Sequence, residues 1–100
     1  MSEKTNASRR RQIKGLAHEL EPLIQIGMQG VTDGVMKNID SALKNHELIK
    51  IKFLEHKDEK EELVRKIVEQ IGSELIDIIG NIAILYKQNP DPKKRKIKLK

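Results

Sequence analysis

Two glycines spaced three residues apart, Gly27 and Gly30, mark the stretch of this sequence whose chemistry is easiest to interpret. The segment Gly27-Met28-Gln29-Gly30 follows a short β-branched run and precedes Thr32, which can cap a helix. The free N–H groups of a helix N-terminus and the positive end of its dipole favour a phosphate group, and glycines let another backbone approach closely. The same spacing also fits an ordinary strand-to-helix turn with positive φ. The residues themselves leave both interpretations open.

Basic residues gather near the two ends of the chain. Residues 1–90 contain 14 lysines and arginines and 14 acidic residues, whereas residues 91–100 contain six basic residues and one acid, so the tail holds the whole net charge of +5. The clustered cations are Arg9, Arg10, Arg11 and Lys14 near the start and Lys93, Lys94, Arg95 and Lys96 near the end. Such segregation suits a surface that binds a polyanion.

Residue types that carry catalysis or hold metals are scarce or scattered. The absence of cysteine excludes disulfides, thiolate zinc sites and cysteine nucleophiles. His18, His46 and His56 fall on different predicted elements without the spacing of a metal site. The carboxylates within residues 58–62 crowd the first turn of a predicted helix, where solvation and the helix dipole explain them. We therefore expect no enzyme, no cofactor, no metal and no small-molecule substrate.

Hydrophobic periodicity predicts alternating helices and strands. The expected elements are a helix over Ser8–Glu19, a strand over Leu23–Ile26, a helix from Thr32 to Asn45, a strand over Glu47–Phe53, a helix started by a capping box of Asp58 and Glu61 and ended at Gly72, and strands over Glu74–Ile79 and Ile82–Lys87. The order α-β-α-β-α-β-β predicts one α/β domain, a four-stranded mixed sheet packed by helices. Strands one to three are expected to be parallel, and the fourth antiparallel to the third across a tight Gly80-Asn81 turn.

The ends of the chain differ in composition from its middle. We predict a flexible N-terminus over residues 1–7, a folded domain over 8–88 and a Pro-broken basic tail over 89–100 that is flexible at least in part and dispensable for folding. The polar start lacks the apolar region of a signal peptide, and the longest near-apolar run, Ile78–Tyr86, is too short to span a bilayer. We therefore expect a cytoplasmic protein without a membrane partner.

Four short segments occur in an order that resembles a known family. They read "LAHELEP", "IGMQGVT", "ALKNHELIKIK" and "IGNIAILYK". Together they resemble the bacterial YhbY type of the CRM domain, the chloroplast RNA splicing and ribosome maturation family, over about Arg9 to Lys87. The resemblance implies a four-stranded mixed sheet with three helices, similar to the C-terminal domain of translation initiation factor three. It thus makes residues 8–88 a CRM-like RNA-binding domain.

The resemblance further implies RNA binding without catalysis. Bacterial stand-alone members are linked to precursors of the large ribosomal subunit, so the implied partner is rRNA, and we expect a monomer. The family's KH-like GxxG loop maps onto Gly27 to Gly30, where Met28 and Gln29 replace the lysine or arginine of many members. The family's basic first helix maps onto the cluster from Arg9 to Lys14.

The residues expected to contact RNA make up a longer set. They are Arg9, Arg10, Arg11, Lys14, Gly27, Met28, Gln29, Gly30, Thr32, Lys50, Lys52, Lys93, Lys94, Arg95 and Lys96. Lys50 and Lys52 share the outer face of a predicted strand, where lysines also serve as solvated edge guards. The tail is expected to act as a mobile polycation.

Aromatic residues are too few for a base-stacking surface of the RRM kind. Phe53 is expected to face the core, and Tyr86 is expected to be a packing residue with a hydrogen-bonded hydroxyl. Recognition is therefore expected to rest on phosphate contacts and RNA shape. The main alternative is a non-catalytic protein-interaction module whose basic ends keep it soluble. DNA binding ranks third, because no recognition-helix pattern stands out.

Overall fold

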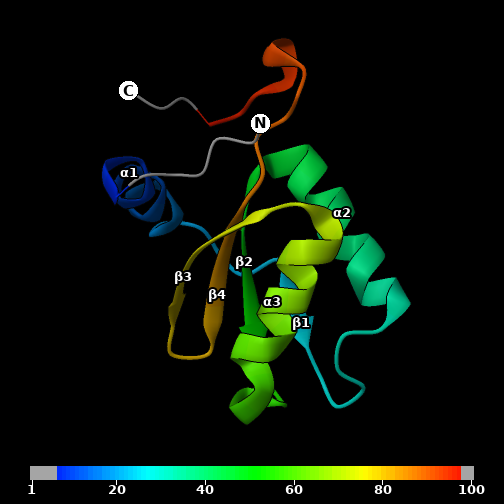
Figure 1. Cartoon of the computed structure of the whole chain (residues 1–100). Helices are drawn as coiled ribbons and strands as arrows, with labels where there is room; N and C mark the ends of the chain where they lie inside the picture. The colour runs from blue at the N-terminus through cyan, green and yellow to red at the C-terminus, as the bar shows by residue number, and fades with distance from the viewer. Residues whose placement is uncertain (1–6, 98–100) are drawn as a thin grey trace.

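The computed structural model describes residues 7–97 and contains one mixed sheet with helices on both faces (Figure 1). Along the chain the elements are α1 (Ala7–Ala17), β1 (Ile24–Ile26), α2 (Asp33–His46), β2 (Leu48–Phe53), the 3₁₀ turn η1 (Lys57–Glu59), α3 (Lys60–Ile71), β3 (Glu74–Ile79), β4 (Ile82–Tyr86) and the 3₁₀ turn η2 (Pro92–Lys94). The predicted order of helices and strands is confirmed. The segment expected to be flexible at the N-terminus lies outside the described residues, except for Ala7.

The four strands pair in the order β1-β2-β4-β3. β1 is parallel to β2, and β4 is antiparallel to both of its neighbours, β2 and β3. The first three strands therefore share one direction and the fourth opposes them, as the sequence predicts. However, β4 lies between β2 and β3, because the turn at Gly80 folds it back along β3 and its free edge then accepts β2.

The two faces of the sheet are covered unequally. Alternation along β2 sends Ile49, Ile51 and Phe53 into the core beneath α2 and α3. On the opposite face, Ile13 and Ala17 of α1 pack in a smaller core with Leu48, Ile76, Ile84 and Tyr86 of the sheet. Each fully buried Ile, Leu or Phe side chain contributes about 1.5–3 kcal/mol to stability. The expected burial of Phe53 and Tyr86 is confirmed.

A bulge in the edge strand β3 decides where Asp77 points. The pairing with β4 shifts between Leu75 and Asp77, so that Asp77 lies opposite Ile84. Ile84 faces α1, and Asp77 faces it too, although strict alternation would have turned the carboxylate toward α2 and α3. The bulge thus keeps a charged side chain out of the larger core.

The ends of the helices are partly as predicted. The Val35 N–H donates to Thr32 Oγ1 at 3.1 Å, which confirms the cap of α2, and α3 ends at Gly72 with φ 75°. The predicted capping box of Asp58 and Glu61 is not formed, so this prediction is wrong. His56 adopts the left-handed conformation at φ 59° and starts η1, so Asp58 lies within the turn, and the residue that precedes α3 makes no side-chain cap.

The sequence predicted that Glu47 is the first residue of a strand, and this prediction is wrong. Glu47 caps the C-terminus of α2 with φ 64°, its N–H donates to the Leu43 carbonyl at 2.8 Å, and its side chain is buried. The turn from helix to strand is completed in this one left-handed residue, so β2 begins at Leu48. The first helix is also shorter than expected, since turns at His18 and Leu20 follow its end at Ala17.

Candidate nucleic-acid interface

The segment Gly27 to Gly30 forms a protruding turn between β1 and the capped start of α2. The Gly30 N–H donates to the Gly27 carbonyl at 3.0 Å, and Gly30 has φ 73°. The positive φ that we expected is therefore found at Gly30 and not at Gly27. Met28 is 81% exposed and Gln29 is exposed as well. The turn consequently offers two side chains and its backbone to the surroundings.

His56 braces this turn from the other side. Its Nε2 lies 2.7 Å from the Met28 carbonyl oxygen, and its ring would be in van der Waals contact with a Cβ at Gly30, at 3.6 Å. Behind it, the N–H groups of Leu54 and Glu55 both donate to the Ile26 carbonyl. The sequence alone gives His56 no such role, because a contact across 28 residues leaves no local signal.

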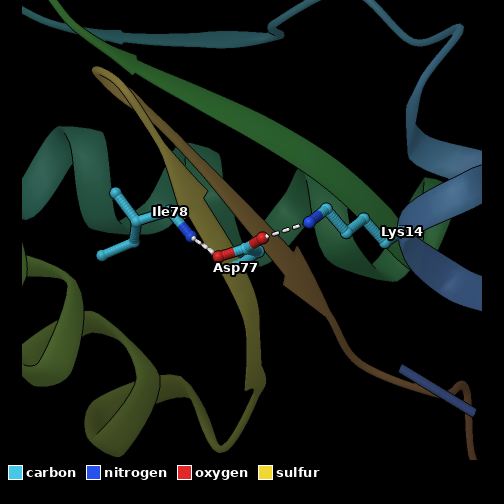
Figure 2. Close-up of polar contacts among 3 residues, drawn as sticks. All are labelled: Lys14, Asp77 and Ile78. Atoms are coloured by element: carbon cyan, nitrogen blue, oxygen red, sulfur yellow. Dashed lines mark hydrogen bonds and ion pairs between the residues drawn. The ribbon is translucent and has the colours of Figure 1, made fainter. Parts of the chain in front are cut away.

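The cations of α1 are not equivalent. Lys14 Nζ lies 2.7 Å from Asp77 Oδ2, and Asp77 Oδ1 accepts from the Ile78 N–H at 2.8 Å (Figure 2). The hydrogen bond from Lys14 holds the pKa of Asp77 below its ordinary value, against the opposing effect of burial. The charge of Lys14 is therefore paired within the protein and is less available to a phosphate. Arg10 and Arg11 are exposed and remain the stronger candidates for a phosphate.

The two lysines of β2 also differ in their surroundings. Lys50 Nζ donates to the Leu20 carbonyl at 3.0 Å and to the His18 carbonyl at 3.5 Å, so it holds the chain that leaves α1. Lys52 is exposed on the same face of the sheet, beside Gln25 of β1. Lys50 thus has a structural partner, whereas Lys52 is open to a ligand.

Two further cations line a groove along the edge of the sheet. Lys60 and Arg65 of α3 and Arg10 of α1 border an open groove of about 650 Å³ beside β3, together with Asp77. Lys60 and Arg65 were not predicted from the sequence, because they alternate with glutamates along α3 and look like an ordinary solvated helix face. Only the fold brings them to the same groove as Arg10.

The basic tail is folded back onto the domain as far as the structure describes it. The buried carboxylate of Glu47 accepts from the N–H groups of Asn89 (2.5 Å), Lys96 and Ile97 (2.8 Å). The tail cations are exposed; they are Lys93, Lys94, Arg95 and Lys96. The partial flexibility expected from the sequence stays a prediction, while the bonds to Glu47 were not expected, because this partner is distant in sequence.

The predicted contact residues form two groups at opposite ends of β2. The turn at Gly27 to Gly30 follows β1 where Ile26 pairs with Phe53, the last residue of β2. The tail follows β4 where Tyr86 pairs with Leu48, the first residue of β2. Six strand residues span roughly 17 Å. Figure 1 shows the same separation, with α1 and the tail at one end and the β1–α2 connection at the other.

Among residues 7–97, no helix is long and apolar enough to cross a membrane. Within that range, no group of three histidine, aspartate or glutamate side chains is placed to hold a metal ion.

Comparison with known proteins places the chain in a family. The CRS1 / YhbY (CRM) domain model matches residues 6–87. "Probable RNA-binding protein PA4753" of Pseudomonas aeruginosa is 36% identical over 86 residues, 85% of this chain and 83% of that protein. An "RNA-binding protein" of Haemophilus influenzae is 37% identical over 82 residues, 81% of this chain and 83% of that protein.

A solved structure agrees with the sequence comparisons. The solution structure of the Staphylococcus aureus protein SAV1595 superposes with a TM-score of 0.77 at 32% identity, and the match covers 95% of this chain and 100% of that one. The segments that resembled the family in sequence are thus matched by a shared fold. The chain belongs to the CRS1 / YhbY (CRM) domain family.

Proposed function

We propose that this protein binds RNA, without catalysis, through the sugar-phosphate backbone. The observation that carries the proposal is the exposed glycine turn at the N-terminus of α2, held in place by His56 and accompanied by exposed cations on the domain. Its membership of the CRM family and the names of its relatives, which are called RNA-binding proteins, support the same function.

A negative charge next to the glycine turn limits how much the turn can contribute to phosphate binding. Asp33 lies in the first turn of α2 and offsets part of the dipole field that would attract a phosphate. Backbone N–H groups and the Gln29 amide are left as donors at this place. Most of the salt-dependent affinity is therefore expected from the cations, above all Arg10, Arg11 and Lys52.

The kind of RNA that the protein binds is a second part of the proposal. We propose rRNA in precursors of the large ribosomal subunit, with the protein acting in the cytoplasm as a monomeric assembly factor. The resemblance of four ordered segments to stand-alone bacterial members supports it. A sedimentation profile of cell lysate tests it: the protein is expected to travel with large-subunit precursors and to leave them after RNase treatment. If the protein were absent from the fractions that contain large-subunit precursors, the assembly role would be refuted.

A protein-interaction module is the second candidate. Leu16, Leu20 and Leu23 are large apolar side chains exposed within a short stretch of chain, and such residues often mark a contact surface. Association that resists RNase would favour this candidate. Direct binding of purified protein to RNA, weakened by salt as expected for released counterions, would favour the first.

A further inference from the structure

Glu47 is a buried acid whose hydrogen-bond donors within residues 7–97 are backbone N–H groups. Its carboxylate belongs to a residue with no exposed surface, and it accepts from the N–H groups of Asn89, Lys96 and Ile97. A buried carboxylate is tolerated only where hydrogen bonds replace its lost water. The residue also adopts φ 64°, a conformation that non-glycine residues adopt rarely. Glu47 is thus buried and has an unfavourable backbone conformation, and its side chain holds the backbone of the tail.

The tail has an internal order of its own between these anchors. Asn89 Oδ1 accepts from the Asp91 N–H at 2.9 Å, and Asp91 Oδ1 accepts from the Lys93 N–H at 3.0 Å. Arg95 Nε donates back to the Asn89 carbonyl at 2.9 Å. These short-range bonds curl the segment around η2, so the single acid of the tail is used to cap a turn. The four tail cations are exposed, although Arg95 also bonds to the tail's own backbone.

The held tail lies beside α1. Ile97 packs against the smaller core that contains Ile13 of α1 and Tyr86 of β4. The pKa of Tyr86 is raised by burial and by the charge of Glu47, while Arg9 lowers it, so both charged groups are close to this phenol. In Figure 1 the red end of the tail runs toward the blue helix α1. The end of the described tail and α1 thus lie on the same smaller core.

We propose that Glu47 is a positioning residue that fixes residues 89–97 as an arm beside α1, so that arm and helix form one continuous surface for an RNA phosphate backbone. The proposal rests on the RNA-binding function proposed above and adds a defined surface to it. The six exposed cations of this surface are Arg10, Arg11, Lys93, Lys94, Arg95 and Lys96. Because the arm is ordered before RNA arrives, binding loses less conformational entropy than with a mobile tail.

Substitution of Glu47 by glutamine tests the arm against simple electrostatics. Glu47→Gln keeps the shape but replaces one acceptor oxygen by an amide NH₂ that cannot accept. The control is Glu69→Gln, an exposed glutamate on α3. Both variants raise the net charge by one, which by itself strengthens binding to RNA. We expect Glu69→Gln to bind at least as tightly as the parent, and Glu47→Gln to bind about fivefold more weakly because its arm is loosened.

Amide hydrogen exchange in the absence of RNA reads the arm directly. In the parent, the amides of Lys96 and Ile97 are expected to be protected, and in Glu47→Gln they are expected to exchange faster while the amides of β2 and β4 remain protected. Unprotected amides in the parent would overturn the proposal, whether or not RNA binds. Protected amides in a parent that binds no RNA would refute the RNA-binding function and the surface built on it, but not the fixed arm.

A second variant covers the case in which Glu47→Gln fails to fold. Ile97→Gln removes the apolar contact of the arm without touching the buried carboxylate. Faster exchange at Lys96 together with weaker RNA binding supports the proposal. Faster exchange with RNA binding equal to the parent would overturn it, because a released arm would then serve as well as a fixed one.

Discussion

Replacement of Gln29 by aspartate is the most direct perturbation of the glycine turn. The side chain is exposed, makes no bond that the fold depends on among residues 7–97, and needs no special backbone angle, whereas Gly30 beside it has φ 73°. A carboxylate at this position places a negative charge where we propose that a phosphate lies. The substitution therefore changes the electrostatics of the turn and leaves the core untouched.

The size of the effect follows from exposure. Two like charges about 4 Å apart in a water-like medium repel by about 1 kcal/mol. Loss of one hydrogen bond from the Gln29 amide adds about 0.5–1.5 kcal/mol. The sum, about 1.5–2.5 kcal/mol, corresponds to a decrease in RNA affinity of at least about tenfold. Since the site is on the surface, the free energy of unfolding is expected to change by less than about 0.5 kcal/mol.

Filter retention at one salt concentration, together with a thermal melt, measures both quantities. The matched control is Gln70→Asp, which makes the same change of charge at an exposed glutamine near the end of α3. We expect the control to lose little affinity, because its charge lies away from the turn. Equal affinities for the two variants, each folded, would show that Gly27 to Gly30 is only a turn. Arg10→Glu would then test α1 as the main RNA-facing surface.

Three further predictions concern the arm, the ion pair and the brace. Truncation of residues 93–100 removes two N–H donors from Glu47, so we expect a loss of about 1–3 kcal/mol in urea unfolding, and a parent-like midpoint would contradict the anchoring. The pKa of Asp77 is lowered in the folded state, so the stabilisation by Lys14 is complete above the ordinary carboxyl pKa of 3.8 and is lost as pH falls through the lowered value. Because both partners are partly exposed, Asp77→Asn is expected to cost less than about 1 kcal/mol at neutral pH, with melting temperatures that converge with the parent's in acid. His56→Ala is expected to leave the melting temperature nearly unchanged but to weaken RNA binding about threefold by loosening the turn, and unchanged binding would remove the brace from the mechanism.

The sequence predicted the elements well where their signals are local. The Thr32 cap, the glycine that ends α3 and the alternation along β2 each depend on residues within one or two turns of chain, and each is confirmed. The directions of the strands followed from the same order of elements. The position of β4 between β2 and β3 could not be predicted in this way, because it depends on which strand of the β3–β4 hairpin pairs with β2.

The surroundings of the candidate contact residues were predicted less well, and for a related reason. Glu47 binds amides about 50 residues away, and His56 binds a carbonyl 28 residues away. Neither residue differs locally from an ordinary charged or polar residue in a helix-to-strand or strand-to-helix connection. Lys14 looked equivalent to its arginine neighbours until the bulge in β3 turned Asp77 toward it. Spacing identifies which cations exist, and tertiary contacts decide which of them are available.

The separation of the two groups along β2 constrains how RNA would lie on the domain. The glycine turn and the arm are roughly 17 Å apart along the strand, so an RNA that contacts both must extend over several nucleotides. Lys52 lies exposed between them on the face of the sheet that α1 only partly covers. With few donors at the turn, the exposed cations of α1, of the arm and at Lys52 would supply most of the affinity, and the turn would fix register. A domain built in this way distinguishes RNAs by the path of their backbone rather than by the identity of their bases.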